Sequence, residues 1–196
     1  MIFRQFVISC RTLTVFSLLT GFAYPFLITG MSQLIFPHQA NGSLIIQNGK
    51  PVGSELIGKN FEDPKYFWGR LSATGPTAFN GASSSGSNFG PMNQALIKAA
   101  QDRMEALHKV DPDNKNLIPV DLVTASASGL DPHITPAAAR YQLARVARLR
   151  GLDENSVEKL ILKNTNGRLL GLLGEPGVNV LKLNLDLDEG AYGSKT

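Results

Sequence analysis

The side chains that could carry out covalent chemistry gather in one short stretch of the chain. Residues 125–133 read Ala-Ser-Ala-Ser-Gly-Leu-Asp-Pro-His, so Ser126 or Ser128, Asp131 and His133 supply the side-chain types of a catalytic triad. In a triad the histidine takes the serine proton while the carboxylate orients the histidine. Triads normally collect their members from separate elements, and these residues are close neighbours along the chain. A serine hydrolase is therefore the alternative hypothesis here, and a structural turn before a helix is the main interpretation.

A second serine-rich stretch covers residues 72–93, which read SATGPTAFNGASSSGSNFGPMN. It shows neither a helical nor a strand period. None of Ser83 to Ser85 has glycine both two residues before and two residues after it, so the stretch lacks a nucleophile elbow. A flexible linker between subdomains is one interpretation. We favour a functional loop, because a loop of this length inside a compact domain usually has a function.

The composition argues against several other kinds of site. The single cysteine, Cys10, and the scattered histidines form no metal-binding pattern, and no Walker loop is present. Of 19 basic residues, Arg4 and Arg11 precede residue 12, which leaves 17 basic against 16 acidic residues, a difference of +1. We therefore expect no metal, no catalytic set, no resident cofactor and no nucleic-acid partner.

One uncharged stretch organises the rest of the chain. Residues 12–36, TLTVFSLLTGFAYPFLITGMSQLIF, would form a helix of about 37 Å, enough for a hydrocarbon core of about 30 Å. A cleaved secretory signal has an apolar run of only about 7 to 15 residues, and no small-x-small cleavage site follows Phe36. A buried core helix is the third interpretation. We favour an uncleaved transmembrane anchor.

Charge predicts how this anchor is oriented. Arg4 and Arg11 precede the span, and the next basic residue is Lys50. Because positive flanks stay in the cytoplasm, residues 1–11 are predicted to be cytoplasmic and residues 37–196 to form one external domain. No second apolar run reaches span length, so a single-pass protein is expected.

The external domain alternates between strand and helix signals. Leu44–Gln47 reads as a short strand, and Asn48-Gly49 predicts a hairpin turn, because a type I′ turn needs positive φ at both central residues. Val120–Thr124 reads as a short strand or extended piece. In Val178–Asp188 leucines alternate with polar residues, a period of two that predicts a strand with one buried face.

Helices are predicted from apolar spacing and capping residues. The first is Met92–Val110, the second runs up to Gly151, and the third ends at Asn164. The capping residues assigned to them are Asn93 or Ser87, Thr135, and Asp153. The fold class is therefore α+β, with one N-terminal transmembrane helix and an external domain of a small β-sheet and three to four helices.

Two groups of side chains each have two interpretations. The adjacent aromatics Tyr66, Phe67 and Trp68 could lie in the membrane headgroup belt or in the domain core. The arginines of the second helix are expected on a solvated face, which could also meet lipid phosphate or an acidic partner. These arginines are Arg140, Arg145, Arg148 and Arg150.

Several motifs resemble the C-subunit family of Kdp-type high-affinity potassium-transporting ATPases, in order and over nearly the whole chain. The matching stretches are Gln39–Ile45, Gly53–Gly58, Tyr66-Phe67 with Arg70, Ser72–Thr74, Ser85–Asn88, Leu122–Asp131, Arg145–Ala147, Val178-Asn179 and Leu183–Leu185. In that family a channel-like subunit carries potassium and a P-type ATPase subunit hydrolyses ATP.

The resemblance implies a non-catalytic subunit of the bacterial inner membrane, needed for assembly and stability. It also implies a catalytic chaperone that raises the ATP affinity of the hydrolysing subunit. The expected partners are the channel-like subunit, the P-type ATPase subunit, a small single-helix subunit and membrane lipid, and ATP would be met through the shared complex. The alternative hypothesis is a membrane-anchored external serine hydrolase.

The matched motifs also supply candidate site residues, which we interpret as partner-facing or structural. They are Arg70, Ser72, Ala73, Asn80, Ser85, Gly86, Ser87, Asn88, Thr124, Ser126, Ser128, Gly129 and Asp131.

Overall fold

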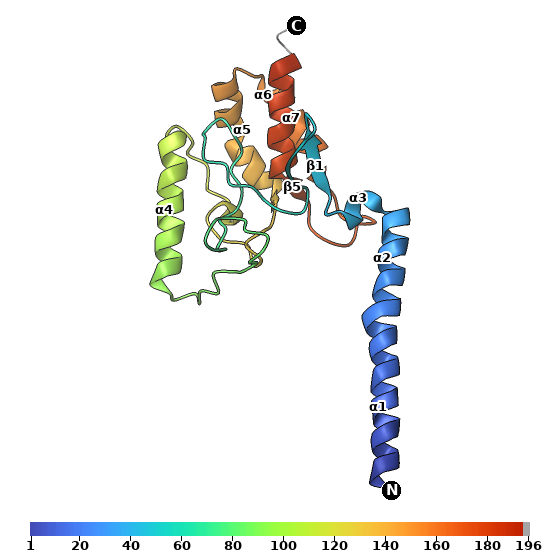
Figure 1. The fold of residues 1–196 in the computed structure, drawn as a ribbon. Coiled ribbons are helices and arrows are strands. Elements are labelled where there is room, and N and C mark those ends of the chain that lie inside the picture. Colours follow the sequence, from blue (N-terminus) through green and yellow to red (C-terminus); the bar gives the residue numbers. More distant parts are fainter. Residues whose placement is uncertain (194–196) are drawn as a thin grey trace. The chain divides into compact units, whose positions relative to one another are not determined.

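The computed structural model describes residues 1–193 of the protein (Figure 1). Residues 194–196 of the predicted 37–196 domain lie outside the described residues. The chain divides into two compact units, Met1–Leu44 and Ile45–Thr196.

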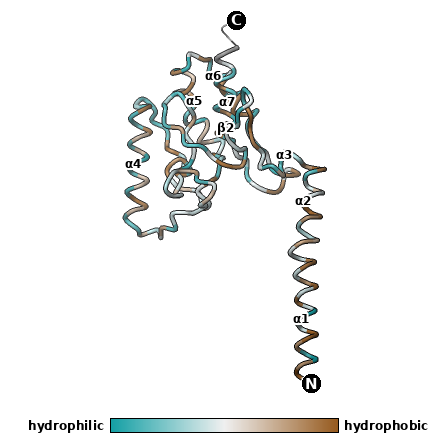
Figure 2. The backbone as a smooth tube through the Cα atoms, in the orientation of Figure 1, coloured by the Kyte–Doolittle hydropathy of each residue, from teal (hydrophilic) through white to brown (hydrophobic). Residues whose placement is uncertain are grey.

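The first unit is almost entirely one apolar helix, which Figure 2 shows as a largely brown tube. It consists of α1 (Ile2–Leu18), the π-helical turn η1 (Leu19–Ala23) and α2 (Tyr24–Ile35), followed by the short α3 (Pro37–Ala40). The widened turn comes just before Pro25, whose ring would clash with the carbonyl four residues earlier in a regular helix.

The helix Ile2–Ile35 is long and apolar enough to cross a membrane. Its 34 residues correspond to about 51 Å, and it begins well before the predicted start of the span at Thr12. The hydroxyls of Thr14 and Thr20 donate to the carbonyls of Cys10 and Phe16, so these polar side chains are satisfied within the helix itself.

The second unit combines small sheets with several helices, which confirms the predicted α+β class. Helices α5 and α7 pack beside strand β5, α6 packs against these two helices, and α4 stands at one edge of the unit (Figure 1). One sheet pairs β1 with β2, and the other has the antiparallel order β3-β5-β4. The elements are β1 (Leu44–Gln47), β2 (Lys50–Ser54), α4 (Gln94–Val110), η2 (Val120–Leu122), β3 (His133–Ile134), α5 (Pro136–Arg150), α6 (Glu154–Lys163), β4 (Thr165–Asn166), β5 (Gly177–Asn179) and α7 (Val180–Gly193).

Local capping signals were the most reliable guide to these elements. The side chains of Asn93, Thr135 and Asp153 each accept a hydrogen bond from a backbone N–H in the first turn of α4, α5 and α6. Gly151 ends α5 with φ +65°. Asn48 and Gly49 both have positive φ between β1 and β2, as the predicted hairpin turn requires.

The predicted strand at Val178–Asp188 is wrong beyond Asn179. Only Gly177–Asn179 is a strand, and the leucine alternation lies in helix α7. Within α7, buried residues recur at helical spacing, at Val180, Leu181, Leu183, Asn184 and Leu187. The buried polar side chain of Asn184 hides that helical stripe from a pattern based on hydrophobicity.

The predicted strand or extended piece at Val120–Thr124 is also wrong. Residues Val120–Leu122 form the 3₁₀ turn η2 after Pro119, and the Thr124 hydroxyl donates to the Val120 carbonyl at 2.8 Å. Leu122 is fully buried, so one apolar anchor and a side-chain cap set this turn.

The core of the second unit joins residues that are far apart in sequence. Phe67 and Trp68 are buried in it with residues of α5, α6 and α7, including Val146, Ile161 and Leu183. The core interpretation of the aromatic group therefore holds for Phe67 and Trp68.

Candidate functional site

The candidate residues lie on two long loops that are fastened to each other. Leu71 forms a parallel bridge with Ala125, and the Ser126 N–H donates to the Leu71 carbonyl at 3.2 Å. Farther along, the Ser85 N–H donates to the Ser128 carbonyl at 3.0 Å. The serine-rich stretch 72–93 is therefore held against residues 125–129 and is not a free linker.

Ser72 is the central fastening side chain. Its hydroxyl donates to the Gly129 carbonyl at 2.7 Å and accepts from the Phe79 N–H at 2.9 Å. It also lies 3.0 Å from the Thr74 hydroxyl. One small hydroxyl thus links three backbone segments, which explains why a residue of this size and polarity stands there.

Asn80 and Thr74 close the turn between them. The Asn80 N–H donates to the Thr74 hydroxyl at 3.0 Å, and the Asn80 side-chain amide donates to the Gly75 carbonyl at 2.7 Å. The Asn80 side-chain oxygen accepts from the Ala82 N–H at 3.1 Å. The tip of the loop therefore has a defined conformation in which Ser83 and Ser84 are exposed.

Two glycines allow the loops to approach closely. A Cβ on Gly86 would lie 2.5 Å from the Ala127 carbonyl oxygen, and one on Gly129 would lie 2.5 Å from the Ser85 carbonyl oxygen. Gly129 also has φ +69°, a conformation that favours glycine. Any side chain at either position would push the two loops apart.

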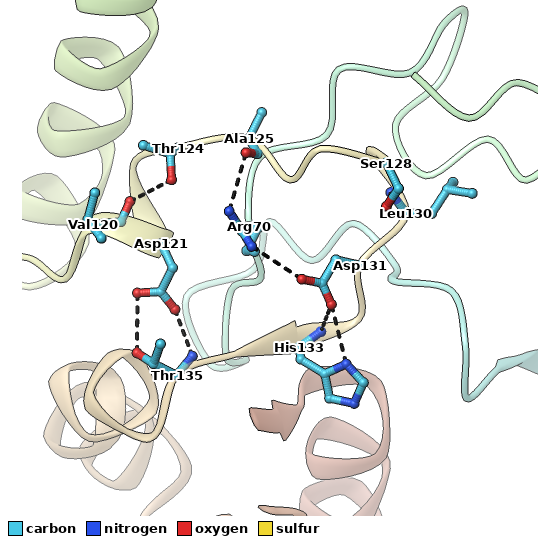
Figure 3. Close-up of polar contacts among 10 residues, drawn as sticks. All are labelled: Arg70, Val120, Asp121, Thr124, Ala125, Ser128, Leu130, Asp131, His133 and Thr135. Carbon is cyan, nitrogen blue, oxygen red and sulfur yellow. Dashed lines mark hydrogen bonds and ion pairs between the residues drawn. The ribbon is translucent and has the colours of Figure 1, made fainter. Parts of the chain in front are cut away.

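Arg70, Asp131 and His133 form the charged part of the site (Figure 3). The Arg70 guanidinium donates to Asp131 Oδ2 and to the Ala125 carbonyl, each at 3.3 Å. Asp131 Oδ1 accepts from the His133 N–H at 3.0 Å and lies 3.3 Å from His133 Nδ1. On its other ring edge, His133 Nε2 lies 3.3 Å from the Asn166 side-chain amide nitrogen.

The surroundings keep Asp131 ionised. Burial would raise the pKa of Asp131, but the hydrogen bonds from His133 and the charges of His133 and Arg70 together hold this pKa below its usual value. A surface pocket of about 170 Å³ lies beside this group and is also lined by Asp121 and Glu175.

Asp121 connects the site to helix α5. Its carboxylate accepts from the Thr135 N–H at 2.7 Å and from the Thr135 hydroxyl at 3.2 Å (Figure 3). Because Thr135 caps α5, the turn η2 and the start of this helix are fixed to each other. Among residues 1–193, the Thr124 side chain bonds only to η2 and does not join the two loops.

The serines do not make a triad with His133. Ser126 Oγ is buried and has no hydrogen-bond partner among the described residues, and Ser128 Oγ accepts from the Leu130 N–H at 3.1 Å. Within residues 1–193, no hydrogen bond joins either serine to His133. This stretch has the geometry of a capped turn stabilised by an ion pair.

The structure places three remaining candidates less centrally. Ala73 and Ser87 are half-buried, and Asn88 is exposed with φ +50°. Neither Ser87 nor Asn88 makes a side-chain hydrogen bond within the described part of the chain. Their assignment as partner-facing residues stays a prediction, as it does for the other candidates.

Sequence reasoning missed a set of buried polar residues that hold the aromatic segment. Asn184 accepts from the Phe67 N–H at 2.9 Å and donates to its carbonyl at 3.0 Å. Gln142 accepts from the Trp68 N–H at 2.9 Å and donates to its carbonyl at 3.0 Å. These side-chain amides satisfy the buried backbone as a neighbouring strand would.

Arginines complete this arrangement. The guanidinium carbons of Arg103 and Arg145 lie 4.8 and 5.2 Å from the centre of the Trp68 ring. Arg145 is only 1% exposed, donates to Gln142 Oε1 at 2.8 Å and also donates to the Pro64 carbonyl, so its predicted place on a solvated face is wrong. Burial lowers the pKa of both arginines to about 10. Polar residues on the buried stripe of a helix are the one sequence signal that could have found this set.

A model of a known family matches nearly the whole chain. The family described as KdpC, the c chain of the K⁺-transporting ATPase, matches residues 6–189. The chain belongs to this family. It is therefore a subunit of a potassium transport complex, as the resemblance of its motifs implied.

Curated relatives match over about nine-tenths of their length. The potassium-transporting ATPase KdpC subunit of Polaromonas naphthalenivorans (strain CJ2) is 62% identical over 174 residues, which cover 89% of this chain and 89% of the relative. The KdpC subunit of Methylococcus capsulatus is 62% identical over 176 residues, or 90% of this chain and 93% of the relative. The KdpC subunit of Herpetosiphon aurantiacus is 60% identical over 175 residues, or 89% and 91%.

Proposed function

We propose that this chain is the non-catalytic assembly subunit of an ATP-driven potassium uptake complex. The match of the family model to residues 6–189 carries the proposal. The proposed partners are the channel-like potassium-translocating subunit, the P-type ATPase subunit and a small single-helix subunit. The apolar helix anchors the chain in the inner membrane beside them.

The site supports a role in positioning a partner. The hydrogen bonds of Ser72 and Asn80 fix the 72–93 loop, so its exposed tip is available without a large loss of conformational freedom on binding. The ion pair of Arg70 with Asp131 holds the 125–131 side of the same surface.

We further propose that the chain raises the ATP affinity of the P-type ATPase subunit indirectly, through contacts within the complex. The charge rule puts the second unit outside, whereas ATP is cytoplasmic. An effect transmitted through the packing of subunits is consistent with that orientation, and direct contact with ATP is not.

Co-purification tests the assembly role. Full-length tagged chain, expressed with the other subunits and extracted in mild detergent, should capture a channel-like subunit and a P-type ATPase. Ser83→Trp at the exposed loop tip should weaken capture, and Lys159→Trp on the exposed face of α6 should not. Capture of neither subunit by the unmodified chain, or ATP turnover by the purified chain alone, would disprove the proposal.

Cysteine labelling tests the orientation separately. In a Cys10→Ser background, Ser83→Cys should react with a membrane-impermeant maleimide from the outer face of the inner membrane. If it reacts only after that membrane is broken, the second unit faces the cytoplasm. Direct contact with ATP would then become the better explanation of the chaperone role.

A further inference from the structure

The second unit carries an apolar projection that the proposed function does not use. Residues 168–175, which we term the leucine hairpin, read Arg-Leu-Leu-Gly-Leu-Leu-Gly-Glu. Leu169, Leu170, Leu172 and Leu173 are 66%, 86%, 82% and 63% exposed. An isolated exposed leucine is ordinary, but four on one short loop form an apolar patch of the kind that marks an interaction site.

The leucine hairpin has a defined shape. Leu169 and Leu173 form an antiparallel bridge in which the Leu169 N–H donates to the Leu173 carbonyl at 2.8 Å. Leu170 and Gly171 at the tip both have positive φ. The leucines are therefore presented by a closed turn.

The leucine hairpin extends directly from two paired strands of the sheet. Strands β4 and β5, which lead into and out of it, pair through Thr165 with Val178 and Asn166 with Gly177. Strand β5 is also paired with β3 on its other side, and Val178 is fully buried. The base of the leucine hairpin is thus anchored in the core of the unit.

Charge is confined to the base of the hairpin and is neutralised there. Arg168 Nη2 donates to both carboxylate oxygens of Glu175 at 2.9 Å. Between these two residues no side chain is polar. An uncharged tip above a neutral ion pair can enter an apolar environment without removing an unpaired charge from water.

The exposure pattern favours lipid over a protein surface as that environment. All four leucines are exposed, and they stand on both sides of Gly171 in one turn. A protein surface docked on one face would leave the leucines of the other face in water. Acyl chains surround an inserted loop and cover every face.

The short link to the apolar helix also keeps the leucine hairpin near a bilayer. The apolar helix ends at Ile35 and the second unit begins at Ile45. Residues 36–44 join them and, at about 3.5 Å per extended residue, reach at most about 32 Å. A unit on so short a tether meets the membrane surface frequently, whichever side it is on.

We propose that the leucine hairpin inserts into the lipid of the membrane that holds the Ile2–Ile35 helix. The second unit then has two attachments to the bilayer, the covalent one through the helix and a reversible one through the four leucines. The insertion goes beyond the assembly role and does not depend on it.

Lipid-borne quenchers test the insertion. Full-length chain with Cys10→Ser and Leu172→Cys is labelled with an environment-sensitive fluorophore and reconstituted alone into phosphatidylcholine and phosphatidylglycerol vesicles. Emission at this position should shift to the blue and should be lost when some lipids carry a spin label near the headgroup. Leu117→Cys, at a leucine that is 94% exposed outside the hairpin, is the matched control and should show neither change.

Each outcome decides the proposal. Quenching at Leu172→Cys but not at Leu117→Cys supports insertion, provided that the urea midpoint of Trp68 fluorescence is unchanged. Equal quenching at both positions, or at neither, overturns it. A blue shift at Leu172→Cys that appears only with the other subunits present, without lipid quenching, also overturns it and assigns the hairpin to a protein contact. These readings are independent of co-purification, so failure here leaves the assembly role standing.

Discussion

At the scale of single residues, two buried side-chain amides supply the hydrogen bonds that a neighbouring strand would otherwise make. Asn184 and Gln142 pair with both backbone groups of Phe67 and Trp68. A buried N–H or carbonyl without a partner costs about 1 to 3 kcal/mol of folding free energy. Removing either side chain therefore costs more than the net contribution of the hydrogen bonds that it makes.

We expect Asn184→Ala to destabilise the second unit by about 3 kcal/mol, because it leaves the N–H and carbonyl of Phe67 unpaired in the core. Urea unfolding in detergent, followed by the fluorescence of the single tryptophan Trp68, measures this change. Asn116→Ala, at an exposed asparagine, should stay within about 0.5 kcal/mol of the unmodified protein. Equal effects of the two substitutions would contradict the structural role of Asn184.

Substitutions at two glycines distinguish the cost of backbone strain from the cost of steric crowding. Gly129 and Gly151 have φ +69° and +65°, but only Gly129 has atoms within 4 Å of an added Cβ. We expect Gly151→Ala to cost about 1 kcal/mol and Gly129→Ala about 3 kcal/mol, because the second also forces the two loops apart. Unfolding midpoints of the two variants, measured side by side, check the difference. A cost at Gly151 as large as at Gly129 would mean that the loops are not in contact.

Asp131 should make the free energy of unfolding depend on pH in the acidic range. Although burial raises the pKa of Asp131, His133 and Arg70 lower it, and the net pKa lies below the ordinary 3.8. A lowered pKa in the folded state means that the carboxylate stabilises the fold above pH 3.8 and that this contribution is lost as the pH falls through the folded value. The stability gap between the unmodified protein and Asp131→Asn should therefore shrink below about pH 4.

Urea midpoints at a series of pH values measure that gap. Asp113→Asn, at an exposed aspartate, is the control variant and is measured over the same pH series. A gap for Asp131→Asn that does not shrink between about pH 4 and pH 3 would show that Arg70 and His133 do not stabilise the carboxylate.

At the scale of elements, the predictable features are those that neighbouring residues encode. The caps Thr135 and Asp153 and the Asn48-Gly49 turn specify their structures through local hydrogen bonds and φ preferences. Strands β3, β4 and β5 have only two or three residues each, too few to show a period. Helix α7 was missed because a polar residue, Asn184, occupies its buried stripe.

The contacts of the candidate site also could not be predicted from neighbouring residues. Motif resemblance selected Ser72 and Gly129, but the hydrogen bond between them joins residues 57 positions apart and follows from no local pattern. The charge of Arg145 predicts an exposed side chain, although its position lies on the buried face of helix α5. Its buried guanidinium is held by backbone carbonyls that only the folded chain brings together.

Leucines of α7 distinguish the helix from the predicted strand. A strand face would bury Leu183 and Leu185 equally, whereas in the helix Leu183 is fully buried and Leu185 only half-buried. We expect Leu183→Ala to cost about 3 kcal/mol and Leu185→Ala about 1 kcal/mol in urea unfolding. Equal costs would favour the strand.

At the scale of the whole molecule, the two units have separate sources of stability. The core cluster lies entirely in the second unit, and helix Ile2–Ile35 has no buried residue. We expect a fragment of residues 41–196 to unfold cooperatively with the urea midpoint of the full chain. Circular dichroism and Trp68 fluorescence should change together. A fragment that unfolds without a cooperative transition would show that the helix contributes to the core.

The closure of the core by Asn184 also sets an order of events during synthesis. The apolar helix is made first and is available to the insertion machinery while Phe67 still lacks a partner that lies 117 residues downstream. The second unit cannot complete its core until α7 leaves the ribosome. If the apolar helix is inserted during synthesis, the chain enters the membrane as an open polypeptide, and truncation before α7 would leave the second unit without a finished core.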